Sequence, residues 1–467
     1  MHDPWAGRRV AVVGLQRSNA AVARYLARGA ALVEAYDAKP AAQLGGYAAA
    51  LPDTARLWAG ADYLQRLAER LEGLAAIFVT PGMRKDLPVL VSAAAAGIPL
   101  WTEAAYVLAH APRPIIGITG SAGKTTTTTL VGEAVRRWRP RSLVGGNIGL
   151  PLIDRLEDLA PDAWLVMELS SFQLELCRTS PRLAALLNIR PNHLDVHGSY
   201  EAYVAAKRRV YRFQGPGDTC LFGLDDPAAA ALAAEAPAGA LGFRAAGPVT
   251  AGAGVLDGQV WWFPPAGGGG APCPVLPLAA IRVPGQHNVE NVAAAVALSA
   301  AAGVPLAGIA EAVADFRGVP HRLEPLRAWR GVEWINDSIA TAPDRVAAAL
   351  DSFAGRPITL LAGGYDKGIP LEALGRLIAE RVRHVILFGA TAERLRVAIA
   401  AGAAEVGRGP DAVQRVTDLG AAVAAAAETA RPGEVVLLSP ACASYDQFRD
   451  FEERGARFRD LVAALPE

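Results

Sequence analysis

Continuous apolar segments recur along the chain, and they constrain its fold more than any other feature. Each is rich in Val, Ile and Leu, is closed by Gly, Ser, Asp or Asn, and precedes an Ala/Leu-rich helical stretch. A strand buried on both faces carries apolar residues at successive positions, as in parallel sheets covered by helices. The sequence therefore predicts an α/β fold with mostly parallel sheets. The clearest predicted strands are Val10–Val13, Ile77–Val79, Ile115–Ile118, Leu165–Met167, Ala185–Ile189, Ile358–Leu361, Val385–Phe388 and Val435–Leu438.

The chain length suggests several domains. At about 150 residues per domain, 467 residues correspond to roughly three. The sequence suggests domain boundaries at Ala111–Pro114, which precedes a new strand, and at Gly318–Pro320, which follows a long helical region. We expect domains at 1–112, 113–318 and 319–467. The Ala/Gly/Pro-rich segment 232–280 is expected to be an irregular or β-rich insert with a short hairpin near Gln259–Phe263.

Composition excludes several classes of protein. The 46 Lys and Arg residues balance 46 Asp and Glu residues, which argues against a basic protein that binds nucleic acid. The alanine-rich stretches are too short and too weakly apolar to insert into a membrane. Four scattered cysteines without a CxxC pair, and an N-terminus without a signal-peptide pattern, favour a cytoplasmic protein with reduced thiols.

A glycine-rich loop follows the third predicted strand. Thr119–Thr126 reads T-G-S-A-G-K-T-T, between that strand and the start of a helix. Glycines at 120 and 123 permit bends that aim backbone N–H groups at phosphate, and the helix N-terminus adds positive potential. Lys124 would reach the terminal phosphates, and the Thr125 hydroxyl would bind Mg²⁺. Ile118 replaces the first glycine of the usual P-loop, so the loop is a shortened variant that favours a nucleoside triphosphate.

Polar residues follow the next two predicted strands. Glu168 ends an apolar run and would lie beside the P-loop, where its carboxylate is suited to Mg²⁺. A helix-capping or salt-bridged glutamate is the alternative. His193, Asp195 and His197 crowd into the loop after the following strand, although each alone could be an ordinary loop residue.

A lysine falls on the apolar face of a predicted helix. In Ser199–Arg212, with Ser199 as a possible N-cap, Tyr203, Lys207, Val210 and Tyr211 share one face. Burial and nearby cations lower the pKa of a lysine amine, and a neutral amine can react with CO₂ to form a carbamate. Such a carbamate could bind a second Mg²⁺. The alternative is a lysine that extends from the apolar stripe to solvent.

The first and last predicted units each offer a crevice. In the first, only Gly14 of a dinucleotide-binding fingerprint is present, since Gln16 and Asn19 occupy the other glycine positions. This unit could bind a nucleotide diphosphate or retain only the fold. The last unit has three strand ends that place small or hydroxyl residues beside charges, as a small acidic substrate would require. They are Asn336–Thr341, Gly363–Gly368 and Ser439–Phe448.

Taken together, the motifs resemble those of the Mur ligase family, from Gly14 to Phe451. The matching segments are T-G-S-A-G-K-T-T-T, G-N-I-G (146–149), M-E-L-S-S-F-Q-L-E (167–175), N-x-x-x-x-H-x-D (188–195), Y-V-A-A-K (203–207), G-Q-H-N-V-E-N (285–291), H-R (321–322), N-D-S-x-A-T (336–341) and S-P-A-C-A-S-Y-D-Q-F-R-D-F-E-E-R-G (439–455). The resemblance implies a Rossmann-like N-terminal domain that binds a UDP-linked substrate, a central P-loop ATPase and a Rossmann-like C-terminal domain.

The resemblance also implies roles for individual residues. Lys124, His193 and Lys207 are expected to be catalytic. The ATP site is expected to comprise Gly120, Ser121, Ala122, Gly123, Lys124, Thr125, Thr126, Asn291, Arg322 and Asp337. The metal positions would be held by Thr125, Glu168, His193 and carbamylated Lys207. The UDP-linked substrate would contact Arg17, Ser18, Asp37, Lys39, Gly82, Asn147 and His193. The incoming glutamate would contact Thr341, Lys367, Ser444 and Phe451.

The implied reaction adds D-glutamate to UDP-N-acetylmuramoyl-L-alanine through an acyl phosphate, with ATP and Mg²⁺, in a monomeric enzyme of peptidoglycan precursor synthesis. The family's G-T-N-G-K-T/S loop is G-S-A-G-K-T here, and Ile339 occupies a position that is often lysine. The missing cation leaves addition of L-glutamate to the same acceptor as an alternative. Another Mur-type or folylpolyglutamate-type ligase and a regulatory ATP-binding module are the remaining alternatives.

Overall fold

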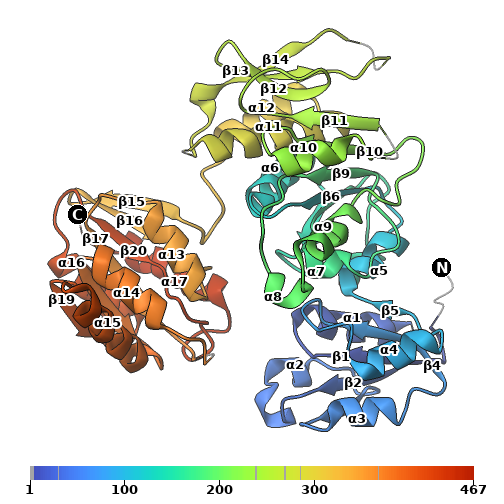
Figure 1. Ribbon diagram of the computed structural model, residues 1–467, viewed down its shortest axis with the longest axis horizontal. Coiled ribbons are helices and arrows are strands. Elements are labelled where there is room, and N and C mark those ends of the chain that lie inside the picture. Colours follow the sequence, from blue (N-terminus) through green and yellow to red (C-terminus); the bar gives the residue numbers. More distant parts are fainter. Residues whose placement is uncertain are drawn as a thin grey trace. The chain divides into compact units, whose positions relative to one another are not determined.

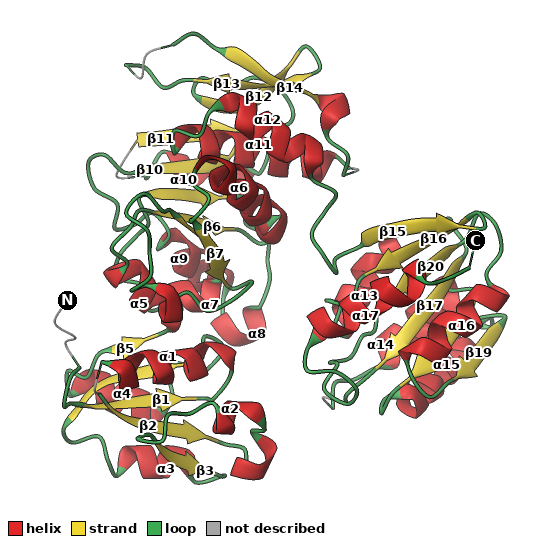
Figure 2. Ribbon diagram, turned by 180° about the vertical axis from the view of Figure 1, so that it is seen from behind, coloured by secondary structure: helices red, strands yellow, loops and turns green. Residues whose placement is uncertain are grey.

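The computed structural model describes residues 5–29, 31–236, 239–267, 270–283, 285–366 and 368–466. The chain divides into two compact units, Met1–Phe316 and Arg317–Glu467. The first unit contains two sheets and the second contains one, and helices flank each sheet (Figures 1 and 2). Most strand pairs in all three sheets are parallel, which confirms the predicted α/β class. Among the described residues, no helix combines the length and apolar character needed to cross a membrane.

The first sheet has the strand order β3-β2-β1-β4-β5 and is parallel throughout. Its strands are β1 (Arg9–Val13), β2 (Leu32–Asp37), β3 (Arg56–Ala59), β4 (Leu74–Val79) and β5 (Leu100–Trp101). The helices around it are α1 (Arg17–Arg28), η1 (Ala41–Gln43), α2 (Gly46–Ala49), α3 (Tyr63–Ala68), α4 (Pro88–Ala95) and α5 (Glu103–His110). The strand order reverses between β1 and β4, and ligands of such sheets bind at the carboxyl ends beside this switch point.

The second sheet has nine strands in the order β14-β13-β12-β11-β10-β9-β6-β8-β7. They are β6 (Ile115–Thr119), β7 (Leu143–Gly146), β8 (Leu165–Glu168), β9 (Leu183–Leu186), β10 (Thr219–Gly223), β11 (Gly239–Phe243), β12 (Gly252–Leu256), β13 (Gln259–Phe263) and β14 (Cys273–Pro277). The helices are α6 (Lys124–Trp138), η2 (Ile153–Arg155), α7 (Ser171–Leu174), α8 (Leu194–His197), α9 (Tyr200–Arg208), α10 (Pro227–Ala233), η3 (Leu278–Ala280), α11 (Gln286–Ala301) and α12 (Leu306–Asp315). Strand β6 lies between β8 and β9, so the carboxyl ends of these three parallel strands meet.

One strand of this sheet and one helix beside it end earlier than the sequence predicts. Strand β9 ends at Leu186, whereas the predicted strand continued to Ile189. The chain leaves the sheet there because the backbone and side chain of Asn188 bond to the loop after β6. Helix α9 has the predicted N-cap at Ser199, but it ends at Arg208, four residues before the predicted end. Tighter turns then carry the chain onward.

The antiparallel strands β13 and β14 extend the second sheet beyond β12. They account for much of the 232–280 segment, and β13 is the strand expected near Gln259–Phe263. The described part of this segment is therefore β-rich, as the sequence predicted.

The third sheet has the strand order β15-β16-β20-β17-β18-β19 and is parallel apart from the β15–β16 pair. Its strands are β15 (Glu324–Trp329), β16 (Val332–Asn336), β17 (Ile358–Gly363), β18 (His384–Phe388), β19 (Ala412–Arg415) and β20 (Val435–Leu438). Its helices are α13 (Pro343–Asp351), α14 (Glu372–Arg381), α15 (Ala392–Val406), α16 (Leu419–Thr429) and α17 (Phe451–Ala463). The ends of β16, β20 and β17 are again neighbours.

Candidate active site

The loop between β6 and α6 has the geometry of a phosphate-binding loop. Gly123 precedes α6 with a φ of 81°, and a Cβ at this position would lie 2.3 Å from Asn291 Oδ1. Both the backbone conformation and the close side chain therefore require glycine. The N-terminus of α6, which has 15 residues, opens directly beyond the loop. Helix N-termini of this kind attract anions.

Asn188 holds this loop from the neighbouring strand end. Its side-chain oxygen accepts the Ala122 N–H at 2.8 Å, and its amide nitrogen donates to Ala122 O at 3.2 Å. Its backbone carbonyl accepts the Ser121 N–H at 3.0 Å. Sequence reasoning assigned Asn188 no role, although an asparagine at a strand end beside a glycine loop is a recognisable signal.

The Lys124 amine folds back over the loop. It donates to Gly120 O at 2.9 Å and to Ser121 O at 3.2 Å. These carbonyl contacts keep the ammonium at the phosphate-binding loop. Thr126, in the same first turn of α6, is partly buried, and Thr127 donates to Asn291 Oδ1 at 3.4 Å. Asn291 from α11 therefore contacts the start of α6 beside the loop.

A buried carboxylate lies at the end of β8. Glu168 is 2% exposed, and its two oxygens accept hydrogen bonds from Thr125 Oγ1 at 2.8 Å and Asn147 Nδ2 at 2.7 Å. Glu168 and Thr125, predicted to hold the metal, therefore meet Asn147, predicted to contact the UDP-linked substrate. Among the described residues, no three His, Cys, Asp or Glu side chains gather as a closed metal cage. The oxygen donors of Glu168 and Thr125 match a Mg²⁺ ion that keeps phosphate oxygens and water as its other ligands.

Lys207 is buried beside the same loop. Its side chain is 1% exposed, which confirms the predicted position on the apolar face of α9. The alternative, a side chain that extends to solvent, is wrong. The amine donates to Gly120 O at 2.8 Å and lies 4.8 Å from the centre of the Tyr203 ring. Burial is the main cause that lowers the pKa of this amine well below its ordinary value. The Lys124 cation lowers it further, while the Glu168 carboxylate opposes the shift.

The two histidines of the next loop have different surroundings. His193 precedes α8 with a φ of 55°, and its ring lies 5.1 Å from that of Phe172. His197 is buried between Ser171 and Glu175, with its ring stacked on Phe172. Burial lowers the pKa of His197, which favours the neutral imidazole. The side chain of Asp195 lies outside the described part of the structure.

The switch point of the first sheet is organised by Asp37. Its carboxylate accepts the backbone N–H of Leu15 at 2.6 Å and that of Lys39 at 2.8 Å. It thereby fixes the turn after β1 and the entrance to α1, whose first residues are Arg17 and Ser18. Asn19 occupies a fingerprint glycine position and donates to the carbonyls of Val13 and Gly14, both at 2.9 Å.

The loop after β4, which contains Gly82, faces the turn after β1. A Cβ on Gly14 would lie 2.7 Å from Thr80 Oγ1, so the two loops are in close contact. Five of the residues expected to contact the UDP-linked substrate therefore lie at the carboxyl ends of three adjacent strands, β2, β1 and β4. They are Arg17, Ser18, Asp37, Lys39 and Gly82.

In the second unit, Asp337 follows β16 and is buried. Its carboxylate accepts Ser439 Oγ at 2.8 Å and the Leu323 N–H at 3.2 Å. Burial raises the pKa of Asp337 to about 6, and these hydrogen bonds and the Arg322 and Arg345 cations oppose the shift. Asp337 and Arg322, both expected to contact the nucleotide, are thus close enough to interact electrostatically.

Arg454 connects the strand ends of the third sheet and was missed in the sequence. Fully buried on α17, it donates to Ser338 Oγ at 3.0 Å, to Ser338 O at 2.9 Å, and to the carbonyls of Cys442 and Ala443. Ser338 Oγ in turn donates to the carbonyl of Phe451. The signal in the sequence was the spacing of Arg454 with Phe458 and Val462, which places all three on one helical face.

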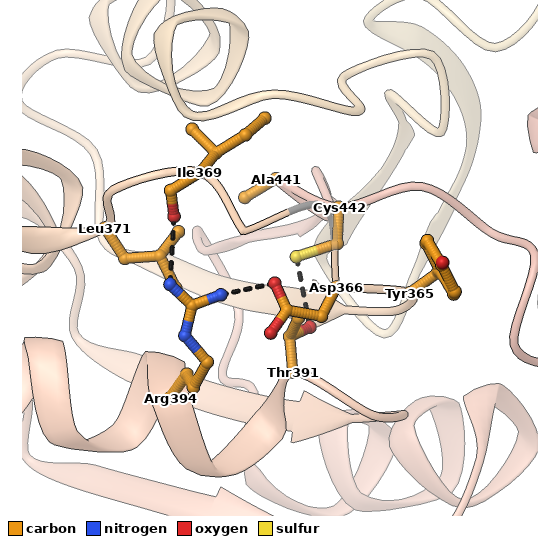
Figure 3. A pocket seen from close by; sticks show the side chains of 8 residues that line it. All are labelled: Tyr365, Asp366, Ile369, Leu371, Thr391, Arg394, Ala441 and Cys442. Atoms are coloured by element: carbon orange, nitrogen blue, oxygen red, sulfur yellow. Dashed lines mark hydrogen bonds and ion pairs between the residues drawn. The ribbon is translucent and has the colours of Figure 1, made fainter. Parts of the chain in front are cut away.

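A small pocket opens beside β17 and β20 (Figure 3). Arg394 reaches across it to Asp366 and to the carbonyl of Ile369, while Thr391 donates to Cys442 Sγ at 3.0 Å. Ser444 is buried, and it follows the pocket residues Ala441 and Cys442 closely in the sequence. Thr341 is partly buried near the end of the loop between β16 and α13, and Lys367 lies outside the described residues.

Comparison with known proteins gives consistent matches over the whole chain. Residues 118–252 match a model described as the Mur ligase middle domain, and residues 321–442 match one described as the Mur ligase, glutamate ligase domain. A UDP-N-acetylmuramoylalanine–D-glutamate ligase of Symbiobacterium thermophilum is 46% identical over 98% of both chains. One from Acidobacterium capsulatum is 40% identical over 98% of this chain and 96% of its own.

Solved structures share the fold. The UDP-N-acetylmuramate-alanine ligase of Thermotoga maritima superposes with a TM-score of 0.54 and 18% identity, covering 98% of this chain and 100% of its own. A murein peptide ligase of Psychrobacter arcticus gives a TM-score of 0.52 at 16% identity, covering 99% and 100%. With the full-length sequence matches, these likenesses lead to one conclusion: the chain belongs to the Mur ligase family.

Proposed function

We propose that this chain is an ATP-dependent ligase that adds D-glutamate to UDP-N-acetylmuramoyl-L-alanine during peptidoglycan precursor synthesis. The observation that carries this proposal is the 46% identity, over 98% of both chains, to a relative named for that reaction. The alanyl carboxylate would take the γ-phosphoryl group of ATP, and ADP would leave. The glutamate amine would then attack the acyl phosphate, forming the amide bond and releasing phosphate and a proton.

In this proposal each part of the chain has one task. Residues 1–112 bind the UDP-linked acceptor, residues 113–318 bind ATP, and residues 319–467 bind glutamate. We further propose that the protein acts as a monomer in the cytoplasm, where its nucleotide substrates are made.

The P-loop residues Gly120–Thr126 would bind the triphosphate. The Lys124 ammonium, now 2.9 Å from Gly120 O, would neutralise charge on the transferred phosphoryl group. The backbone N–H groups at the start of α6 would bind the remaining phosphate oxygens. Asn188 supports this role because it fixes the loop through its side chain and its backbone.

Magnesium would be held by Thr125, Glu168, His193 and carbamylated Lys207. The buried oxygens of Glu168 and Thr125, 2.8 Å apart, support this assignment. When bound, Mg²⁺ supplies positive charge that stabilises the phosphate oxygens during transfer. The chain's own contribution is to aim the Glu168 carboxylate, with Asn147 holding its second oxygen.

The carbamate would form when the neutral Lys207 amine attacks CO₂. A C–N bond forms, and one amine proton passes to solvent. The lowered pKa of Lys207 supports this step because it raises the fraction of neutral amine. The position near Lys124 supports it as well, since that cation would stabilise the negative carbamate.

The remaining contacts are proposed from the family pattern. Acceptor contacts would come from Arg17, Ser18, Asp37, Lys39, Gly82, Asn147 and His193. Nucleotide contacts would come from Asn291, Arg322 and Asp337. Glutamate contacts would come from Thr341, Lys367, Ser444 and Phe451.

Ile339 favours a second candidate, in which the same acceptor receives L-glutamate. Ile339 is apolar, whereas a lysine at this position would supply a cation for a carboxylate of the incoming glutamate. Because this cation is missing, the preference for D- or L-glutamate is tested separately. The full-length relatives from Symbiobacterium thermophilum and Acidobacterium capsulatum are named as D-glutamate ligases, which favours the D-isomer.

Phosphate release from ATP tests the proposed activity. The full chain should release phosphate only when ATP, UDP-N-acetylmuramoyl-L-alanine and glutamate are all present. The matched control is Lys124→Ala, which should retain the fold and lose this turnover. Release that is independent of the muramoyl acceptor would overturn the proposal and favour the regulatory ATP-binding module instead.

A further inference from the structure

The imidazole of His197 contacts residues at both ends of the one-turn helix α7. His197 Nε2 lies 3.0 Å from Ser171 Oγ at the start of the helix, and Nδ1 lies 3.0 Å from Glu175 Oε1 just beyond its end. The ring also stacks on Phe172, with centres 4.9 Å apart and planes 2° apart. Three contacts therefore fix the orientation of a helix that is too short to be stable alone.

The second oxygen of Glu175 binds a lysine from the loop between β4 and α4. Lys85 Nζ lies 3.0 Å from Glu175 Oε2 and also donates to the carbonyl of Pro81. Pro81 belongs to the loop after β4 that contains Gly82 and faces the turn after β1. Next to Glu175, Leu176 packs against the apolar core of the first sheet. The Lys85 amine thus ties this loop to α7.

Helix α7 directly follows the strand that carries Glu168. Ser171 is three residues beyond Glu168, and the intervening Ser170 forms a capping box with Gln173. A change in the position of α7 would therefore move the turn that aims the Glu168 carboxylate at Thr125.

The donors and acceptors of the hydrogen bonds among Lys85, Glu175, His197 and Ser171 can be assigned consistently. Burial lowers the pKa of His197, with Glu175 opposing the shift and His193, Lys207 and Lys85 adding to it. In the neutral ring, Nδ1–H donates to Glu175, so Nε2 accepts the Ser171 hydroxyl proton. Lys85 donates to the same carboxylate from the other side. Burial lowers the pKa of the Lys85 amine, and the Glu175 carboxylate offsets part of that cost.

We propose that Lys85 is a positioning residue that couples the acceptor-binding loop after β4 to the Glu168 turn through Glu175, His197 and Ser171. The inference rests on the proposed function, because it takes the bound group at that loop to be the nucleoside diphosphate of the acceptor. Occupation of the loop would hold Lys85 against Glu175, and this contact would keep α7 and Glu168 in place for phosphoryl transfer.

Binding of UDP and steady-state kinetics test the coupling in the full chain. Lys85→Met should raise the KM for the UDP-linked acceptor about tenfold, the size expected for a charge-assisted contact, and leave the KM for ATP unchanged. Lys85→Arg should restore much of the loss. Arg84→Met is the matched control, since Arg84 is an exposed neighbour that pairs with Asp86 and should have no effect.

The distinguishing measurement is a double-mutant cycle with His197→Gln, scored by UDP affinity in calorimetry. His197 lies on helix α8, beside the second sheet and away from the proposed UDP site. Its replacement should nevertheless weaken UDP binding in the wild-type background and have little further effect in Lys85→Met. Additive effects, or unchanged UDP affinity in both single variants with unaltered thermal unfolding, would overturn the coupling. A wild-type chain that neither binds UDP nor uses the acceptor would instead refute the proposed function.

Discussion

Lys207 places a buried amine 2.8 Å from the carbonyl oxygen of Gly120 in the P-loop. Its place on the apolar face of a helix followed from the spacing of Tyr203, Val210 and Tyr211, and the structure confirms complete burial of the side chain. The proximity of Lys124 and Glu168 could not be predicted from spacing, because both lie on elements far away in the sequence. Asn188 and Arg454 each carried a local signal, but their hydrogen-bond partners lie on distant segments and needed the structure.

Lys207→Ala should lower kcat on the order of a hundredfold, as expected when a charge-stabilising group is lost from an active site. A short carboxylate such as acetate should restore part of the activity by occupying the position of the carbamate. Initial rates with and without acetate check this result. Arg208→Ala is the control, because its partly exposed side chain pairs with Glu235 outside the site. Full activity of the Lys207 variant without acetate would contradict the assigned role.

The elements follow the apolar pattern closely where packing alone decides their limits. Strands β1, β6 and β20 lie where continuous Val, Ile and Leu runs predict them. The prediction fails at β9, because the expected strand Ala185–Ile189 included Asn188, whose side chain bonds to the P-loop after the strand has ended. The asparagine was visible in the sequence, but its bonding partner on a distant segment was not, because hydrogen bonds between distant segments carry no periodicity.

Helix α5 begins with a carboxyl group whose ionisation should affect stability. Glu103 is 2% exposed, and one of its oxygens accepts the N–H groups of Leu152 and Ile153. Burial raises its pKa from 4.5 to about 7, despite the opposing effect of these two hydrogen bonds. Because the folded-state pKa is the higher one, this group's stabilising contribution is complete below pH 4.5 and is lost as the pH rises through 7.

Glu103→Gln should therefore raise the stability at pH 8 by up to about 3 kcal/mol and change it little at pH 4. The amide oxygen can still accept both N–H groups, and no charge is buried. Urea unfolding midpoints at the two pH values, measured beside wild type, check the prediction. A variant that is less stable than wild type at pH 8 would show that the ionised carboxylate is favourable in this position.

At the level of the whole molecule, zero net charge is compatible with two anionic nucleotide substrates. Local features attract the phosphates: the P-loop, the N-terminus of α6 and the Lys124 ammonium. Composition therefore excluded a general nucleic-acid binder but contained no information about the substrate. Motifs spread over the full length identified the family, whereas the Lys85–Glu175 contact between two sheets required the structure.

The most direct test of the central claim is the identity of the amide product. The full chain should be incubated with ATP, Mg²⁺, UDP-N-acetylmuramoyl-L-alanine and an equimolar mixture of isotopically distinct D- and L-glutamate. Mass spectrometry of the product should show the D-isomer label almost alone, with one ADP formed per product. Incorporation of the L-isomer label in its place, or ATP hydrolysis without an amide product, would contradict the account.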